Sequence, residues 1–311
     1  MAETITIRPL ERGDLPEVLD LLRAALGEPP WRTPESFAWK HYDNPFGVSL
    51  ALVAETSGRL VGLRALMRWE LTTPTGETLR CLRAVDTATH PEFQRRGIFR
   101  RLTEEAVELA RGEGVDLIFN TPNPKSGAGY LAMGWVEVGA VGVLVRPSWR
   151  LMVRSQPTNL ENLLTDPVPA FPVEVEDRAP LGLRTPRTEA YLKWRYASHP
   201  TARYFRIDAK DSVAVVRPNT RNGNPELIVV DVYGPHPSAP LRRAARSTRA
   251  AYTAAWFSPG APERRAALLS GLLPVPRLKA LTLMARPLKD LPYDVTSMEN
   301  WDLAISDLEL L

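Results

Sequence analysis

Hydrophobic and polar positions follow two different periods along the first part of the chain. Residues 5–9 place apolar side chains at every second position, which predicts a strand. Apolar residues then recur at helical spacing over residues 15–26. There Asp14, followed three residues later by Glu17, is typical of a helix N-terminus. A second helix, rich in aromatic residues, is predicted for residues 34–42. The chain therefore opens with a strand and two helices.

The patterns that follow predict a series of strands with two helices between the last of them. Strand-like runs occupy residues 50–55, 60–67, 82–89, 115–120 and 136–145. Ser57 and Gly58 join the first two of these runs and predict a tight hairpin turn. Helical patterns begin after Gly97 and in the block that contains Tyr130. The order is typical of a mixed α/β (α+β) domain.

The second half of the chain repeats the first half in outline. Short segments recur in the same order, although any one of them alone is at the level of chance. They pair residues 39–45 with 194–200, Asp86 with Asp231, 119–122 with 257–260, 134–135 with 271–272, and 143–147 with 283–287. This common order predicts a duplication. We expect domains at residues 1–153 and 181–311, joined by a Pro-rich, acidic linker at residues 154–180.

Composition narrows the class of protein. Among the 311 residues, 44% are hydrophobic, and the net charge is only +3, so a nucleic-acid partner would need a focused basic patch. Cys81 is the single cysteine, which excludes a disulfide within the chain, and with only four histidines we expect no metal site. No apolar run reaches the length of about 20 residues that a membrane span needs. We therefore expect a cytoplasmic protein without a membrane partner.

One basic cluster could supply such a patch. Arg242, Arg243, Arg246 and Arg249 follow one another at helical spacing. The simplest interpretation is a solvated helix face, and the alternatives are an acidic partner or nucleic acid. The composition as a whole does not favour nucleic acid.

A turn between a strand and a helix has the properties of an anion site. The strand at residues 82–89 leads into Gly97, and a helical pattern follows at once. The first N–H groups of a helix have no partner within it, and the helix dipole favours an anion there. Arg95, Arg96 and Arg100 add positive charge. The alternative is an ordinary turn with a solvated basic face.

Two motifs resemble those of the GNAT-type N-acetyltransferases. Residues 94–99, Gln-Arg-Arg-Gly-Ile-Phe, resemble the family's Q/R-x-x-G-x-G/A loop, and residues 90–93, His-Pro-Glu-Phe, match the usual approach to it. The block from Asn123 to Trp135 resembles the family's segment N-x-x-A/S-x-x-x-Y-x-x-x-G-F/W. One position differs from the family's loop motif, because Phe99 stands where the family usually has a small residue. The size of this residue affects how closely the backbone can approach a pyrophosphate.

The resemblance implies two tandem GNAT-like domains, each with a mixed, mostly antiparallel sheet flanked by helices. Tandem proteins that resemble mycothiol synthase and the Eis-type acetyltransferases have this architecture. The resemblance also implies acetyl-CoA as co-substrate and no metal. The expected cofactor-binding residues are Thr87, Ala88, Thr89, Gln94, Arg95, Arg96, Gly97, Ile98, Phe99, Arg100, Asn123 and Ser126.

The resemblance further implies catalytic roles. Tyr130 is the expected general acid for the leaving thiolate; the alternative is a tyrosine that packs its helix on the core. Asp86 is the candidate general base, with a structural hydrogen-bond partner as the alternative; His90 and Glu92 are weaker candidates. The aromatic residues Trp31, Phe37, Trp39, Tyr42 and Trp135 either line an acceptor pocket or belong to the core.

The second half lacks these motifs. After Asp231 it has no Gln-x-x-Gly loop and no counterpart of Tyr130, and Pro235, Pro237 and Pro240 remove N–H donors from the turn. We therefore expect one working site, in the first half. The second half would pack against it, wall the acceptor pocket or form a homodimer.

The sequence thus predicts transfer of an acetyl group from acetyl-CoA to a primary amine, in a ternary complex, with a small molecule as acceptor. The alternative is a non-catalytic acyl-CoA-binding or interaction protein in which Phe99 marks a decayed site. A nucleic-acid-binding module is a third interpretation and depends on the arginine cluster alone.

Overall fold

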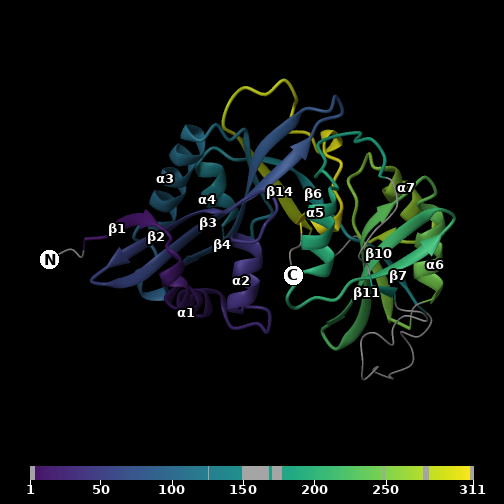
Figure 1. Cartoon of the computed structure of the whole chain (residues 1–311), viewed down its shortest axis with the longest axis horizontal. Coiled ribbons are helices and arrows are strands. Elements are labelled where there is room, and N and C mark those ends of the chain that lie inside the picture. The colour runs from purple at the N-terminus through teal and green to yellow at the C-terminus, as the bar shows by residue number, and fades with distance from the viewer. Residues whose placement is uncertain are drawn as a thin grey trace. The chain divides into compact units, whose positions relative to one another are not determined.

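The computed structural model describes residues 4–124, 126–148, 168–169, 177–247, 249–275 and 280–308. Its internal contacts separate two compact units. Unit 1 comprises Met1–Leu71, Thr78–Val138 and Leu283–Thr296, and unit 2 comprises Thr72–Glu77, Gly139–Thr282 and Ser297–Leu311. Among the described residues, no helix combines the length and the apolar character that crossing a membrane requires. Figure 1 shows the elements of each unit.

Unit 1 is built on one mixed sheet of seven strands, in the order β1-β2-β3-β4-β5-β14-β6. Its strands are β1 (Thr6–Pro9), β2 (Leu50–Thr56), β3 (Arg59–Thr72), β4 (Thr78–Thr89), β5 (Leu117–Asn120), β14 (Leu281–Pro287) and β6 (Val136–Val141). Its helices are α1 (Leu15–Leu26), α2 (Pro34–His41), α3 (Ile98–Gly112) and α4 (Gly127–Ala132), with short 3-10 turns at Arg12–Asp14 and Pro91–Phe93. The expected order of strands and helices is confirmed here.

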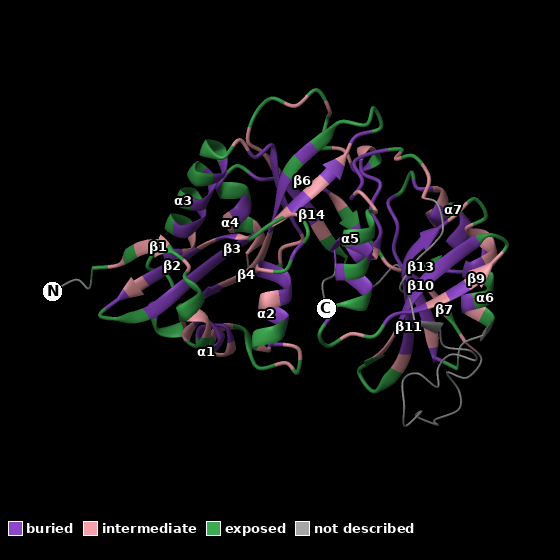
Figure 2. Ribbon diagram, viewed as in Figure 1, coloured by how far each residue is buried: buried purple, intermediate pink, exposed green. Residues whose placement is uncertain are grey.

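The helices of unit 1 cover both faces of its sheet. Because side chains alternate along a strand, Leu52 and Ala54 of β2 pack with α3 and Tyr130, whereas Val53 packs with α1 and Phe37. Both faces of the central strands are therefore buried, as Figure 2 shows. This arrangement fixes β4 between two layers of helices.

Unit 2 has a second sheet of seven strands, in the order β13-β7-β12-β11-β10-β9-β8. Its strands are β7 (Leu144–Pro147), β8 (Val168–Pro169), β9 (Phe205–Ala209), β10 (Ser212–Arg221), β11 (Asn224–Tyr233), β12 (Tyr252–Ala255) and β13 (Leu273–Pro274). Its helices are α5 (Glu189–Leu192), α6 (Ser238–Ser247), α7 (Pro262–Leu269) and α8 (Ile305–Leu308), with a π-helical turn at Lys193–Ala197 and a 3-10 turn at Met298–Asn300.

Read from the opposite end, the second sheet has the strand order of the first. Only the sixth strand is taken from the other half of the chain: β14 pairs with β5, and β7 pairs with β12. The two strands lie in equivalent registers, since Arg286 faces Ile118 and Arg146 faces Thr253. These are the segments whose sequences echo each other, so either can complete either sheet.

The strand exchange changes the domain boundaries. The sequence indicated two contiguous domains, at residues 1–153 and 181–311, whereas each unit includes a strand from the other range. The single strand expected at residues 136–145 is two strands, because β6 joins the first sheet and β7 the second. Most of the expected linker at residues 154–180 lies outside the described residues.

The start of α1 differs from the expectation in one detail. Asp14 holds the N-cap position, but its carboxylate makes no cap bond to α1; it accepts the Glu11 N–H at 2.9 Å and pairs with Arg8. Glu17 accepts the Leu60 N–H at 2.7 Å and so ties the helix to β3. A tertiary contact replaces the local capping box.

Candidate active site

The candidate site of unit 1 begins where two parallel strands separate. Cys81, Leu82 and Arg83 of β4 pair with Leu117, Ile118 and Phe119 of β5, and the pairing ends there. The residues that follow on both strands, from Ala84 and from Asn120, line a cleft of about 580 Å³. Asp86 lies on this part of β4 with a φ of 43°, in the left-handed region that breaks a regular strand. The sheet therefore opens at the end of β4.

Nearly all the residues expected from the sequence meet in this cleft. Its lining includes Asp86, Thr87, Ala88, Thr89, Gln94, Arg95, Gly97, Ile98, Phe99, Arg100, Asn123, Ser126 and Tyr130. Arg96 is the exception: its guanidinium donates to the Glu92 carbonyl at 3.3 Å and lies over the Phe93 ring at 4.7 Å. His90 and Glu92 do not line the cleft either.

The loop before α3 leaves the N-terminus of that helix open to the cleft. Gly97 is the N-cap residue, with a φ of 75°, and within the described chain no side chain caps the helix and no acidic residue occupies its first turn. The first N–H groups of α3 therefore remain available to an anion. Arg95, also in the left-handed region at 63°, lines the cleft and is exposed, whereas Arg100 pairs with Glu104 at 2.7 Å.

Phe99 fits beside the cleft because Gly129 has no side chain. The rings of Phe99 and Tyr130 meet edge to face, with centroids 5.5 Å apart. A Cβ on Gly129 would lie 3.1 Å from Cε1 of Phe99, which is tighter than ordinary contact. The large residue in the loop is therefore matched by a small one on α4, and a cleft remains beside it.

Tyr130 lies on α4 with its ring buried at 4% exposure. Its hydroxyl accepts a hydrogen bond of 2.6 Å from Arg64 of β3. Asn123 precedes the same helix, and its Oδ1 accepts the Ser126 N–H at 3.1 Å, so this side chain also orders the turn that begins α4. Asn123 therefore lines the cleft and also orders the start of α4.

Asp86 is held by two side chains of α2. Its Oδ2 receives the Lys40 ammonium and accepts His41 Nε2 at 3.0 Å, while His41 Nδ1 lies 2.9 Å from Ser49 Oγ. Burial opposes ionisation of the carboxyl, but Lys40 and His41 outweigh it and hold the Asp86 pKa well below its usual range. Both of its partners must be displaced or rearranged before Asp86 could accept a proton, and its general-base role stays a prediction. Burial also lowers the pKa of His41, despite the opposing effect of Asp86.

Comparison with known proteins gives the family. Residues 6–138 match the family model described as the acetyltransferase (GNAT) domain. The N-alpha-acetyltransferase RimI of Mycobacterium tuberculosis is 32% identical over 138 residues, which is 44% of this chain and 82% of RimI. The chain belongs to the GNAT superfamily. It is an acyltransferase.

Solved GNAT structures extend the similarity to the whole chain. A GCN5-related N-acetyltransferase from Kribbella flavida aligns with a TM-score of 0.61 at 15% identity, over 92% of this chain and 71% of that one. A putative acetyltransferase from Pyrococcus horikoshii aligns with a TM-score of 0.54 at 14% identity, over 98% and 95% of the two chains. Identities this low show the fold alone, and here they show it for both GNAT-like domains.

The site contains residues that the sequence interpretation missed. Arg64, Lys40 and His41 contact the expected catalytic residues, and Gly129 makes room for Phe99. Arg64 had a detectable signal, because it is a charged residue inside an apolar strand pattern. The aromatic residues considered for an acceptor pocket, Trp31, Phe37, Trp39, Tyr42 and Trp135, do not line the cleft. Of these, Phe37 and Trp39 are buried in unit 1 at 2% and 4% exposure.

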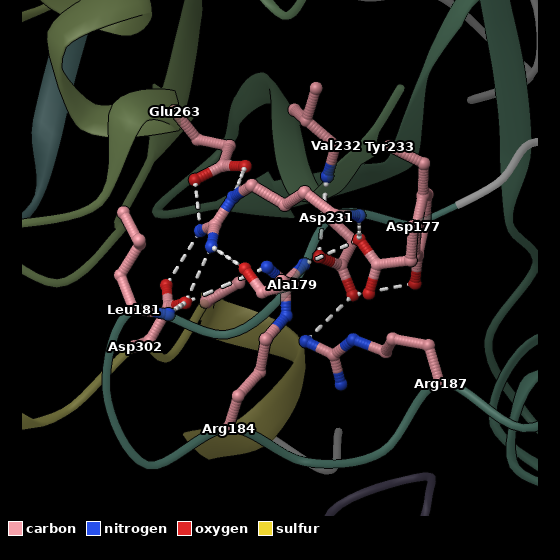
Figure 3. Close-up of polar contacts among 12 residues, drawn as sticks. Asp177, Ala179, Leu181, Arg184, Arg187, Asp231, Val232, Tyr233, Glu263 and Asp302 are labelled. Carbon is pink, nitrogen blue, oxygen red and sulfur yellow. Dashed lines mark hydrogen bonds and ion pairs between the residues drawn. The ribbon is translucent and has the colours of Figure 1, made fainter. Parts of the chain in front are cut away.

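The equivalent opening in the second GNAT-like domain is filled by the chain itself. Pairing of β11 with β12 ends at Val229 and Ala255. Beyond that point Phe257 bridges Ala304, and the Ser258 N–H donates to the Leu303 carbonyl at 2.9 Å. Ser306 then donates to Asp231 at 2.8 Å. Figure 3 shows Asp231 with Arg187 among the buried charges of this unit.

Across the described ranges, no group of three or more His, Cys, Asp or Glu residues is placed to hold a metal ion. Cys81 is buried, and burial raises its pKa well above the usual value. Its thiol does not line the cleft.

Proposed function

We propose that unit 1 transfers an acetyl group from acetyl-CoA to a primary amine of a small molecule, by direct attack in a ternary complex. One observation carries this proposal: the uncapped N-terminus of α3 and the hydroxyl-bearing ring of Tyr130 belong to one cleft. The first feature suits a pyrophosphate and the second a leaving thiolate, and acetyl-CoA has both groups.

The cleft suggests how acetyl-CoA would lie. The N–H groups from Gln94 to the first turn of α3 would bind the pyrophosphate, with Arg95 as the exposed cation beside it. The edge of β4 at Thr87–Thr89, which no longer pairs with β5, would bind the pantetheine arm. A backbone N–H near Thr89 would polarise the thioester carbonyl, which needs no particular side chain.

The reaction then requires two proton movements. The neutral amine attacks the carbonyl carbon, the new C–N bond forms, and the C–S bond breaks to release the CoA thiolate. Tyr130 gives its phenolic proton to the sulfur. The amine loses one proton to water, and an equivalent proton from water returns to the tyrosine. The products are the N-acetylated amine and free CoA.

Asp86 would position groups in this scheme. Its carboxylate is already bonded to Lys40 and His41, which hold its pKa below the usual range, so we assign the ammonium proton to water and not to Asp86. The carboxylate nevertheless lines the cleft near the small apolar residues Ala25 and Ala84. Small apolar side chains beside a carboxylate that Lys40 already neutralises would leave room for a compact acceptor, which supports a small-molecule substrate.

Thermal unfolding with and without acetyl-CoA tests the binding half of the proposal. Ligand at about 100 times its Kd should stabilise the folded state by about 2.7 kcal/mol. Gly97→Glu should abolish the shift, because it places a carboxylate at the N-terminus of α3. Gly76→Glu is the matched control: Gly76 also has a positive φ, 88°, an added Cβ there meets nothing within 4 Å, and it lies at the other end of β4. Equal shifts in both variants would contradict the predicted site.

Release of free CoA thiol with a panel of amines tests the catalytic half. The panel includes small primary amines and short peptides with free N-termini. Tyr130→Phe should lower kcat by about 10²-fold or more, with the Kd for acetyl-CoA unchanged. If Tyr130→Phe keeps the full rate, Tyr130 is not the acid. If the wild type binds acetyl-CoA but acetylates no amine, the binding-protein alternative is favoured.

A further inference from the structure

Arg64 is a buried cation in the middle of an apolar strand. It lies on β3, its side chain has 0% exposure, and its neighbours in the run from Leu60 to Met67 are apolar or glycine. Arginine is rarely buried unless it is paired, because removing its charge from water is costly. Its placement therefore requires an explanation.

A single nitrogen of this guanidinium reaches two cleft residues. Nη1 donates to the Tyr130 hydroxyl at 2.6 Å and to Thr87 Oγ1 at 2.8 Å. Its other nitrogens, Nε and Nη2, are buried and have no hydrogen-bond partner among the described residues. Nor does any carboxylate of the described chain form an ion pair with Arg64; the rings of Tyr130 and Phe99 lie 5.2 and 5.9 Å from its Cζ. The positive charge is therefore directed at the tyrosine without a compensating carboxylate.

This geometry determines which way the tyrosine donates. A guanidinium can only donate hydrogen bonds, so the Tyr130 oxygen must be the acceptor in the pair. The phenolic proton then points elsewhere, and within the described part of the chain the hydroxyl has no second partner. Because Tyr130 lines the cleft, that proton is free for a group bound there.

The charge also favours the transfer itself. When Tyr130 gives up its proton, negative charge forms on the oxygen 2.6 Å from Nη1. The attraction between a fixed cation and that charge is stronger in a buried site than the same attraction would be in water, and the cation needs no reorganisation as the charge forms.

The second GNAT-like domain offers an internal comparison. Arg64 pairs with Leu52, four residues before the end of β2, and the equivalent position in the β9–β10 hairpin is Val216, which pairs with Phe205. Val216 is fully buried at 0% exposure. The copy without a counterpart of Tyr130 therefore has an apolar residue where unit 1 has the arginine. The sheet architecture does not need a cation at this position.

We propose that Arg64 is the positioning residue that makes Tyr130 a proton donor in acetyl transfer. This inference rests on the proposed function of unit 1. Arg64 acts through the tyrosine: it fixes the direction of the phenolic proton and stabilises the phenolate that follows its loss. Thr87, the second acceptor of Nη1, keeps the guanidinium against the end of β4.

A double-mutant cycle between Arg64 and Tyr130 tests the proposal. Arg64→Met should lower kcat at least tenfold while the KM for acetyl-CoA changes less than twofold. In a Tyr130→Phe background the same substitution should lower kcat less than twofold further, because the group on which Arg64 acts is gone. Arg64→Lys, which can still donate one hydrogen bond to the hydroxyl, should restore part of the rate.

Arg83→Met supplies the matched control for loss of a buried arginine. Arg83 is 4% exposed, lies over Trp69 with its Cζ 5.8 Å from the ring, and does not line the cleft. We expect it to lower thermal stability without lowering kcat. Equal losses of kcat from Arg64→Met in both backgrounds would overturn the positioning role, as would a loss confined to stability. If Tyr130→Phe alone keeps the full rate, Tyr130 is not the proton donor. The proposed role of Arg64 is then overturned together with the role of Tyr130.

Discussion

The two units have the same sheet and use its open end in opposite ways. In unit 1, β4 and β5 separate around a cleft of about 580 Å³. In unit 2 the equivalent separation of β11 and β12 is filled by Phe257 and by the segment from Leu303 to Ser306. The topology of a GNAT-like sheet alone therefore creates the opening between its fourth and fifth strands. The segments that follow decide whether the opening binds a ligand or becomes core.

The comparison also separates architecture from chemistry within unit 1. His41 bonds Asp86 in unit 1, and at the equivalent sequence position the Tyr196 hydroxyl bonds Asp231 at 2.8 Å in unit 2. Because the link persists in unit 2, where described segments fill the equivalent opening, we infer that it holds the helical segment to the sheet. By the same logic Arg64, replaced by Val216 in unit 2, belongs to the chemistry of unit 1.

The largest expected effect is on the stability of unit 2. Asp231 and Asp307 both pair with the buried Arg187, at 3.2 and 2.7 Å. Asp231→Ala leaves that arginine with one carboxylate partner, Asp307, and should cost about 3–5 kcal/mol of unfolding free energy, because arginine cannot lose its charge. Asp86→Ala should cost less, about 1–3 kcal/mol, since Lys40 then faces the open cleft. Equilibrium urea unfolding measures the loss of stability in both variants. Equal losses would show that the filled end of one sheet and the open end of the other contribute equally to stability.

The next effect is a pH dependence that originates at His41 of unit 1. The folded-state pKa of buried His41 is lowered, so the unfolded chain binds more protons as pH falls below about 6.5. Its stabilising contribution is therefore complete above pH 6.5 and declines by at most about 1.4 kcal/mol per pH unit below it. Asp302 and Asp307 of unit 2 have lowered pKa values, because Arg178 and Arg184, or Arg187, outweigh the effect of burial. Their contributions persist until the pH falls below about 4, the usual aspartate value.

Urea unfolding of the wild type and of His41→Gln between pH 7.5 and 5 checks this prediction. The stability advantage of the wild type should shrink as the pH falls, whereas the cost of Asp307→Ala should stay constant over the same range. A wild-type advantage that grows towards acid would show that His41 is protonated in the folded state and would reverse the assignment.

The smallest effect concerns the exposed arginines. Arg95→Gln should raise the KM for acetyl-CoA about two- to fivefold, since an exposed charge contributes up to about 1 kcal/mol. Arg242→Gln, which removes an exposed arginine in the middle of α6, should leave this KM unchanged. Steady-state kinetics at low ionic strength measures both. A shared increase would indicate a general charge effect rather than binding at the cleft of unit 1.

Local pattern was sufficient for most of the fold. Side chains that face a core repeat at every second position along β1 to β4 and at helical spacing in α1 and α3. These elements could therefore be predicted from the sequence. The exchange of β7 and β14 between the two sheets could not be predicted from the sequence, because the two strands have similar sequences and pair in equivalent registers. A choice between two equivalent partners depends on chain path, which no local pattern encodes.

Motifs with fixed spacing were enough to predict the family, the loop around Gly97 that we propose binds an anion, and the helix that carries Tyr130. The contacts from which we infer roles for Asp86 and Arg64 came from the tertiary structure. Lys40 and His41 reach Asp86 across 45 or more positions of the chain, and Arg64 reaches Tyr130 across 66. Protonation and hydrogen-bond direction depend on such neighbours in space, and the fold alone brings them together.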